Sequence, residues 1–236
     1  MFDVPRDALR QSKLFWLVFW PIASLAIGIV ALYFATSLNQ FGDASDADRY
    51  DAMYRSYYAL TIAGEVGFLW WFASWLKSRH LMDAVFEIRP THFVIETGYG
   101  LVLYGISLVF AIAAVEMIVP ALPIEVAPSE SRYGGGGVLG ILLVSTTVVI
   151  FAPLVEEFIM RGWLLPKLAA RMGGWVLPII ISATAFGLMH ILVDIPTMIY
   201  TTVLGIFAGL ARRLTGRLWA PIILHLVNNT VASLPF

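Results

Sequence analysis

Two adjacent carboxylates, Glu156 and Glu157, lie inside a long apolar stretch of the sequence. Ionisable side chains are costly in such segments and are usually retained there for a function. His190 and His225 each lie in a later apolar stretch, and Asn229 follows His225 by one helical turn. An acid, two imidazoles and an amide are thereby expected to converge from three apolar segments. The pattern predicts a catalytic site built within a membrane.

The two glutamates are expected to have different roles, because neighbours on a helix diverge by about 100°. Arg161 follows Glu157 by four residues, the spacing at which a carboxylate and a guanidinium meet on one helix face. We therefore expect Glu157 to pair with Arg161 as a structural group and Glu156 to act as the general base. The alternative is that both glutamates only tie helices together.

The other polar groups also follow helical spacing. Phe186 and His190 are four residues apart and share a helix face. Glu156 and His190 are equidistant from Gly173, so a turn at Gly173 places them at the same level on antiparallel helices. Each histidine has the alternative role of an interhelical hydrogen-bond donor. Asp194 either orients His190 or lies in the loop before the next helix.

Three short motifs thus follow one another on separate segments: Glu156-Glu157-x-x-x-Arg161, Phe186-x-x-x-His190 and His225-x-x-x-Asn229. Their types and order resemble the signature of the CAAX amino-terminal protease family, which includes CAAX prenyl endopeptidases and bacteriocin-processing enzymes. The resemblance extends over residues 156–229, and the first half of the chain carries no such motif.

The resemblance implies an intramembrane endopeptidase that cleaves near the C-terminus of membrane-associated proteins or peptides, prenylated CAAX proteins among them. By position, Glu156 is similar to the family's catalytic glutamate and His190 to the histidine that helps it activate water. His225 and Asn229 resemble the pair that stabilises the oxyanion. The alternative functions are a non-catalytic relative, such as a bacteriocin-immunity or scaffold protein, and a small transporter.

A metal-free site is the favoured reading of these residues. Glu156, His190 and His225 could form a zinc set, which is the alternative. Asn229 is a poor zinc ligand, however, and the sequence contains no HExxH motif. We therefore expect no cofactor.

The composition indicates that this site must form in a lipid bilayer. The 236 residues are 59% hydrophobic and 13% charged, far from the roughly 25% charged residues of globular domains, and mean hydropathy is +0.82. The net charge of −1 gives no sign of a nucleic-acid partner. Because there is no cysteine, disulfides and thiolate chemistry are excluded. The bilayer is the expected partner, and no feature of the sequence indicates an oligomeric state.

Apolar runs of near-spanning length predict an all-α bundle of about seven transmembrane helices, within a range of six to eight. The runs are at residues 14–38, 57–76, 98–119, 138–160, 176–193, 197–211 and 218–234. We expect a single transmembrane domain over 1–236, in which residues 1–137 precede a catalytic core at 138–236.

The distribution of basic residues predicts the orientation. With the N-terminus in the cytoplasm, only Arg49, Arg55 and Arg132 of the 15 Lys and Arg residues lie outside. That asymmetry is typical of cytoplasmic loops. We therefore expect a prokaryotic inner-membrane protein with its site open to the cytoplasm.

Overall fold

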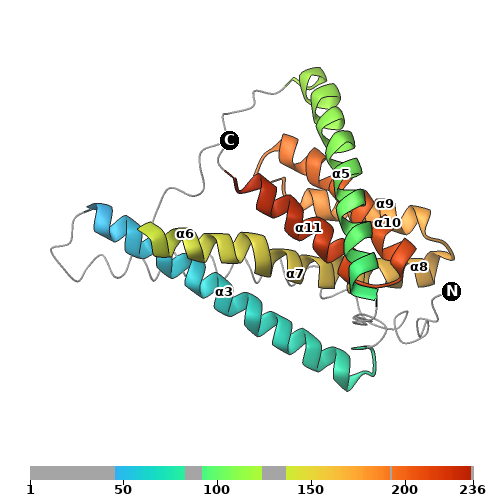
Figure 1. Ribbon diagram of the computed structural model, residues 1–236, viewed down its shortest axis with the longest axis horizontal. Helices are drawn as coiled ribbons and strands as arrows, with labels where there is room; N and C mark the ends of the chain where they lie inside the picture. The colour runs from blue at the N-terminus through green and yellow to red at the C-terminus, as the bar shows by residue number, and fades with distance from the viewer. Residues whose placement is uncertain (1–45, 83–91, 124–136, 192, 235–236) are drawn as a thin grey trace. The chain divides into compact units, whose positions relative to one another are not determined.

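The computed structural model describes residues 46–82, 92–123, 137–191 and 193–234. Throughout this part of the chain the regular elements are helices, with no strand (Figure 1), which confirms the all-α prediction. Among the described residues, four helical stretches are long and apolar enough to span a membrane: Tyr50–Ser78, Phe93–Ala121, Gly137–Met172 and Ile195–Thr215. Helices of this length and composition are typical of an integral membrane protein.

The predicted number of seven spans is not confirmed. The first predicted run, 14–38, lies outside the described residues. The runs expected at 176–193 and 218–234 form shorter helices, α9 (Val176–Leu188) and α11 (Trp219–Ala232). A cytoplasmic N-terminus stays a prediction.

The chain divides into two compact units. The described residues of unit 1 are 74–82, 92–123, 156–191 and 193–234, and those of unit 2 are 46–73 and 137–155. Unit 2 contains most of α3 (Asp46–Ser78), all of α6 (Gly137–Ser145) and the start of α7 (Ala152–Glu157). The single domain with a catalytic core at 138–236 stays a prediction. Every predicted site residue belongs to unit 1.

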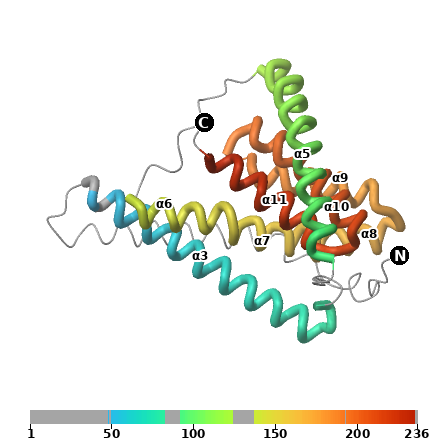
Figure 2. Tube along the Cα trace, in the orientation of Figure 1, coloured from blue at the N-terminus to red at the C-terminus, as the bar shows by residue number. Residues whose placement is uncertain are grey.

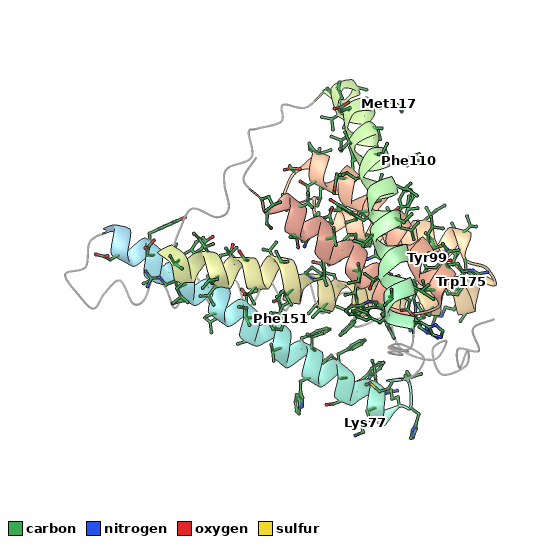
Figure 3. All side chains as sticks on the ribbon, in the orientation of Figure 1. Lys77, Tyr99, Phe110, Met117, Phe151 and Trp175 are labelled. Carbon is green, nitrogen blue, oxygen red and sulfur yellow. The ribbon has the colours of Figure 1, made fainter. Side chains whose placement is uncertain are left out.

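Unit 1 is organised around α10 (Ile195–Thr215). It packs against α9, α11 and α5 (Phe93–Ile118), and α5 also packs along α11, an arrangement that the tube view displays (Figure 2). Tyr99, Phe110 and Met117 are exposed along α5 (Figure 3). Its outward face is therefore apolar, as a lipid-facing helix requires.

Two glycines allow α9 and α10 to approach closely. A Cβ atom on Gly205 would lie 3.0 Å from the Cα atom of Ala183, and one on Gly209 would lie 3.0 Å from Ile179 Cγ2. Small residues at this spacing let membrane helices pack backbone to backbone. Because residue numbers rise along α10 as they fall along α9 in these contacts, the two helices run antiparallel.

The predicted turn at Gly173 is present. α8 (Leu165–Met172) ends with Gly173 in the left-handed conformation, at φ 72°, and α9 begins two residues after Gly174. Glycine adopts this conformation without the steric penalty of a Cβ atom. The guanidinium of Arg213, near the end of α10, lies 5.5 Å from the Trp175 ring centroid, as the antiparallel packing of α9 and α10 requires.

Two wide helical turns interrupt the long segment at 137–172. Residues Thr146–Phe151 and Phe158–Leu164 are π-helical, and each stretch precedes a proline, Pro153 or Pro166. Proline lacks an N–H and its ring clashes with the preceding turn, so local widening relieves the helix there. π-Helical turns are frequent at functional sites, and the second one begins directly after Glu157.

Candidate active site

Arg161 and Glu157 form a buried ion pair. Arg161 Nη1 donates to Glu157 Oε1 over 2.7 Å, and both residues are 0% exposed. Arg161 Nη2 also donates to the Gly205 carbonyl oxygen, 3.1 Å away on α10. The predicted pairing of Glu157 with Arg161 is therefore observed, and the arginine additionally joins this helix to α10.

His225 lies between the two glutamates. Its Nδ1 atom is 2.9 Å from Glu157 Oε1, and its Nε2 atom is 3.6 Å from Glu156 Oε2. An ionised carboxylate only accepts, so Nδ1–H donates to Glu157 and Nε2 is the nitrogen turned toward Glu156. The His225 side chain is 3% exposed, whereas that of Glu156 is 18% exposed. Glu156 is thus the more accessible of the two glutamates.

Phe186 contacts both histidines and the arginine. Its ring centroid lies 4.9 Å from that of His190 and 5.4 Å from that of His225, in both cases edge to face. The Arg161 guanidinium lies over the same ring, 4.7 Å from its centroid. Such aromatic and cation–π contacts favour fixed ring orientations. One fully buried phenyl ring therefore brings the two imidazoles together.

His190 follows α9, one turn beyond Phe186. Its Nδ1 atom lies 3.0 Å from the Phe186 carbonyl oxygen. Since a carbonyl can only accept, Nδ1 carries the proton, and Nε2 of the neutral imidazole keeps a lone pair. That nitrogen has the chemistry needed to accept a hydrogen bond from water. Within the described residues, His190 forms no ion pair with Glu156, whose imidazole neighbour is His225.

Asn229 lies on α11 one turn after His225, and its amide is part of a hydrogen-bonded chain. Asn228 Nδ2 donates to Asn229 Oδ1 over 2.9 Å, and the Tyr200 hydroxyl donates to Asn228 Oδ1 over 2.7 Å. Asn229 was predicted from the sequence as a site residue, whereas Asn228 and Tyr200 were not. The adjacency of two asparagines in an apolar helix was a usable signal for Asn228, whereas Tyr200 is identified only by the packing of α10 on α11.

Asp194 is the N-cap of α10. Its side chain accepts a hydrogen bond from the Thr197 backbone N–H over 2.5 Å. This satisfies one of the N–H groups that a helix start leaves without an intrahelical partner. The observed bond supports the second of the two sequence alternatives, in which Asp194 lies in the loop before Pro196.

Zinc held by Glu156, His190 and His225 was the alternative to a metal-free site. In the part of the chain that the structure describes, no three His, Cys, Asp or Glu side chains converge as a metal-binding group. The metal-free site and its zinc alternative both stay predictions.

One comparison with known proteins gives a match that covers the site residues. The family model described as type II CAAX prenyl endopeptidase Rce1-like matches residues 138–231. That range contains both glutamates, both histidines and the two asparagines of the site. No curated protein and no solved structure matches the chain significantly. The expected resemblance to CAAX proteases is confirmed by this match over residues 138–231.

Proposed function

We propose that the chain is an intramembrane endopeptidase that uses Glu156 to activate water. The observation that carries this proposal is the contact of Glu156 with His225, 3.6 Å from oxygen to Nε2. The far side of that imidazole is anchored by the buried pair of Glu157 and Arg161. The more accessible of the two glutamates thus lies beside an imidazole whose orientation is fixed, which is the arrangement that proton transfer needs.

The proposed reaction is hydrolysis of a peptide bond. Glu156 takes a proton from water, and the water oxygen attacks the carbonyl carbon to form a tetrahedral intermediate. His190 Nε2 accepts a hydrogen bond from the same water. When the intermediate breaks down, the C–N bond cleaves and the amine leaves with the proton that Glu156 carried.

The oxyanion is stabilised by groups on α11. The Asn229 amide N–H groups are donors one helical turn from His225, on one face of that helix, and His225 Nε2 is a second donor whenever it carries a proton. Donors that bind the oxyanion only as its negative charge develops in the transition state accelerate the reaction without tightening substrate binding. No step in this scheme requires a metal.

The substrate proposed is a membrane-associated protein cleaved near its C-terminus, with a prenylated CAAX segment as the first candidate. Five basic residues lie around the two helix turns at one end of unit 1: Lys167, Arg171, Arg212, Arg213 and Arg217. Basic residues of this kind are typical of the cytoplasmic side of a membrane protein. We propose that this end faces the cytoplasm, in a prokaryotic inner membrane.

The experiment uses the full chain purified into lipid nanodiscs. The probe is a farnesylated CAAX peptide with a fluorophore and a quencher on opposite sides of the bond after the prenylated cysteine. An unprenylated peptide of the same sequence is the matched control substrate. Cleavage in water labelled with heavy oxygen should place one heavy oxygen in the new carboxyl group, since water is the nucleophile.

The outcomes separate the proposals. Cleavage of the farnesylated peptide alone supports a prenyl-dependent enzyme, and equal cleavage of both peptides supports an endopeptidase without prenyl selectivity. If neither peptide is cut, or if the product carries no label from water, the proposed hydrolysis is overturned.

A further inference from the structure

Tyr200 and Asn228, the first two members of the hydrogen-bonded chain Tyr200–Asn228–Asn229, have no assigned role in the reaction just described. Asn228 is 6% exposed and lies in an apolar helix, where an amide is costly to bury without hydrogen bonds. Its oxygen accepts from Tyr200, and its nitrogen donates to Asn229. The oxygen and the nitrogen of the Asn228 amide are therefore each engaged inside the protein.

The direction of these bonds decides what Asn229 can offer. A side-chain amide has one oxygen acceptor and one nitrogen that carries two donors. The Tyr200 hydroxyl, as donor, requires the Asn228 oxygen on its side, which leaves the Asn228 nitrogen facing Asn229. That nitrogen in turn requires the Asn229 oxygen on its side. The Asn229 nitrogen is then turned away from Asn228, with its N–H groups as the donors.

We propose that Tyr200 and Asn228 are positioning residues that fix the Asn229 amide with its N–H groups toward the oxyanion. The inference rests on the proposed function, in which Asn229 donates to that oxyanion. Without the chain, the Asn229 amide can rotate by half a turn and present an oxygen, which repels the developing charge. A preorganised donor is worth more than one that must reorient during the reaction.

Asn228→Asp is the most informative variant because it reverses the direction of the hydrogen bond between residues 228 and 229. A carboxylate can only accept, so it draws the Asn229 N–H groups toward itself and turns the Asn229 oxygen toward the site. Its kcat should fall as far as that of Asn229→Ala, about 10²- to 10³-fold, the usual loss for one oxyanion donor. Tyr200→Phe removes only the first bond and should lower kcat about five- to tenfold.

The KM for the quenched peptide should change less than twofold in both variants, because the oxyanion exists only in the transition state. Tyr99→Phe, at an exposed tyrosine of α5, is the matched control and should keep the wild-type kcat. Should Asn228→Asp fail to fold in nanodiscs, Tyr200→Phe carries the test, because it removes a single oxygen atom.

The deciding measurement is a double-mutant cycle on whichever peptide the wild-type protein cleaves. If Tyr200 acts through Asn229, Tyr200→Phe should cost nothing further in an Asn229→Ala background. Equal losses in both backgrounds, or a Tyr200→Phe variant with wild-type kcat, would overturn the inference. Failure of the proposed function is distinguishable, because the wild-type protein would then cleave neither peptide, or Asn229→Ala and Glu156→Gln would themselves retain the wild-type rate.

Discussion

Glu157 Oε1 lies 2.9 Å from His225 Nδ1, across 68 residues of sequence. The same oxygen accepts from Arg161 at 2.7 Å. This single carboxylate oxygen therefore neutralises a buried guanidinium and fixes the orientation of the imidazole that faces Glu156. The structural glutamate and the candidate catalytic glutamate are adjacent in sequence and act on opposite nitrogens of one histidine.

Arg161→Met should destabilise the fold and abolish cleavage together. It leaves Glu157 as a buried carboxylate without its guanidinium, and loss of one partner from a buried pair typically costs about 3–5 kcal/mol. Thermal unfolding in detergent measures the first effect, and the peptide assay measures the second. The double variant Arg161→Met with Glu157→Gln is the control. It should recover part of the thermal stability without recovering activity, and a double variant less stable than the single one would contradict this account.

Phe186→Leu should lower kcat about tenfold with little change in KM. The leucine fills most of the buried volume but has no ring edge or face for the imidazoles, and each aromatic contact contributes roughly 0.5–1.5 kcal/mol. Phe110→Leu, at an exposed position on α5 (Figure 3), is the matched control and should keep its kcat. Wild-type kinetics in Phe186→Leu would show that the ring does not orient the histidines.

Gly205→Ala should lower the unfolding temperature. The added Cβ would lie 3.1 Å from Ala183 Cβ and 3.2 Å from Arg161 Nη2, so α9 and α10 must separate slightly. Overpacking of this kind costs about 1–3 kcal/mol. In Gly105→Ala the new Cβ meets no atom within 4 Å, and alanine there should be neutral or stabilise the helix by up to about 1 kcal/mol. If both variants have the same unfolding temperature, the close approach of α10 to α9 is wrong.

Asp194→Ser should leave both stability and peptide cleavage unchanged, because serine also caps a helix. Asp194→Ala should lose about 0.5–2 kcal/mol of stability through the missing cap on α10. A large fall in kcat for Asp194→Ser, with unfolding unchanged, would instead show that Asp194 orients His190. Thermal melts and initial rates measured on the same nanodisc samples separate the capping role from the orienting role.

What the sequence could predict at the site depended on local spacing. Glu157 and Arg161 are one helical turn apart, so a helix is sufficient to bring them together, and the turn at Gly173 needs only a glycine that tolerates positive φ. The contact of Glu157 with His225 depends on how segments distant in sequence pack. This contact therefore cannot be predicted from any single segment of the sequence.

Other features were beyond local patterns for the same reason. Glu156 and His190 were expected to act together because both are equidistant from Gly173. That symmetry assumes regular α-helix, and the π-helical turn at Phe158–Leu164 changes the register between them. The structure shows Glu156 beside His225, and the joint action of Glu156 and His190 stays a prediction. Tyr200 likewise gave no signal, because its partner Asn228 lies on a different helix.

The most direct test of the central claim is the cleavage rate of Glu156→Gln in nanodiscs, with Glu116→Gln as the matched control. Glutamine keeps the size of the side chain but cannot take a proton from water, whereas Glu116 is exposed on α5 and distant in sequence from the site motifs. We predict that Glu156→Gln loses at least about 10²-fold in kcat, the lower range for a general base, with unchanged unfolding, while Glu116→Gln cleaves at the wild-type rate. Wild-type cleavage by a folded Glu156→Gln protein would contradict the account.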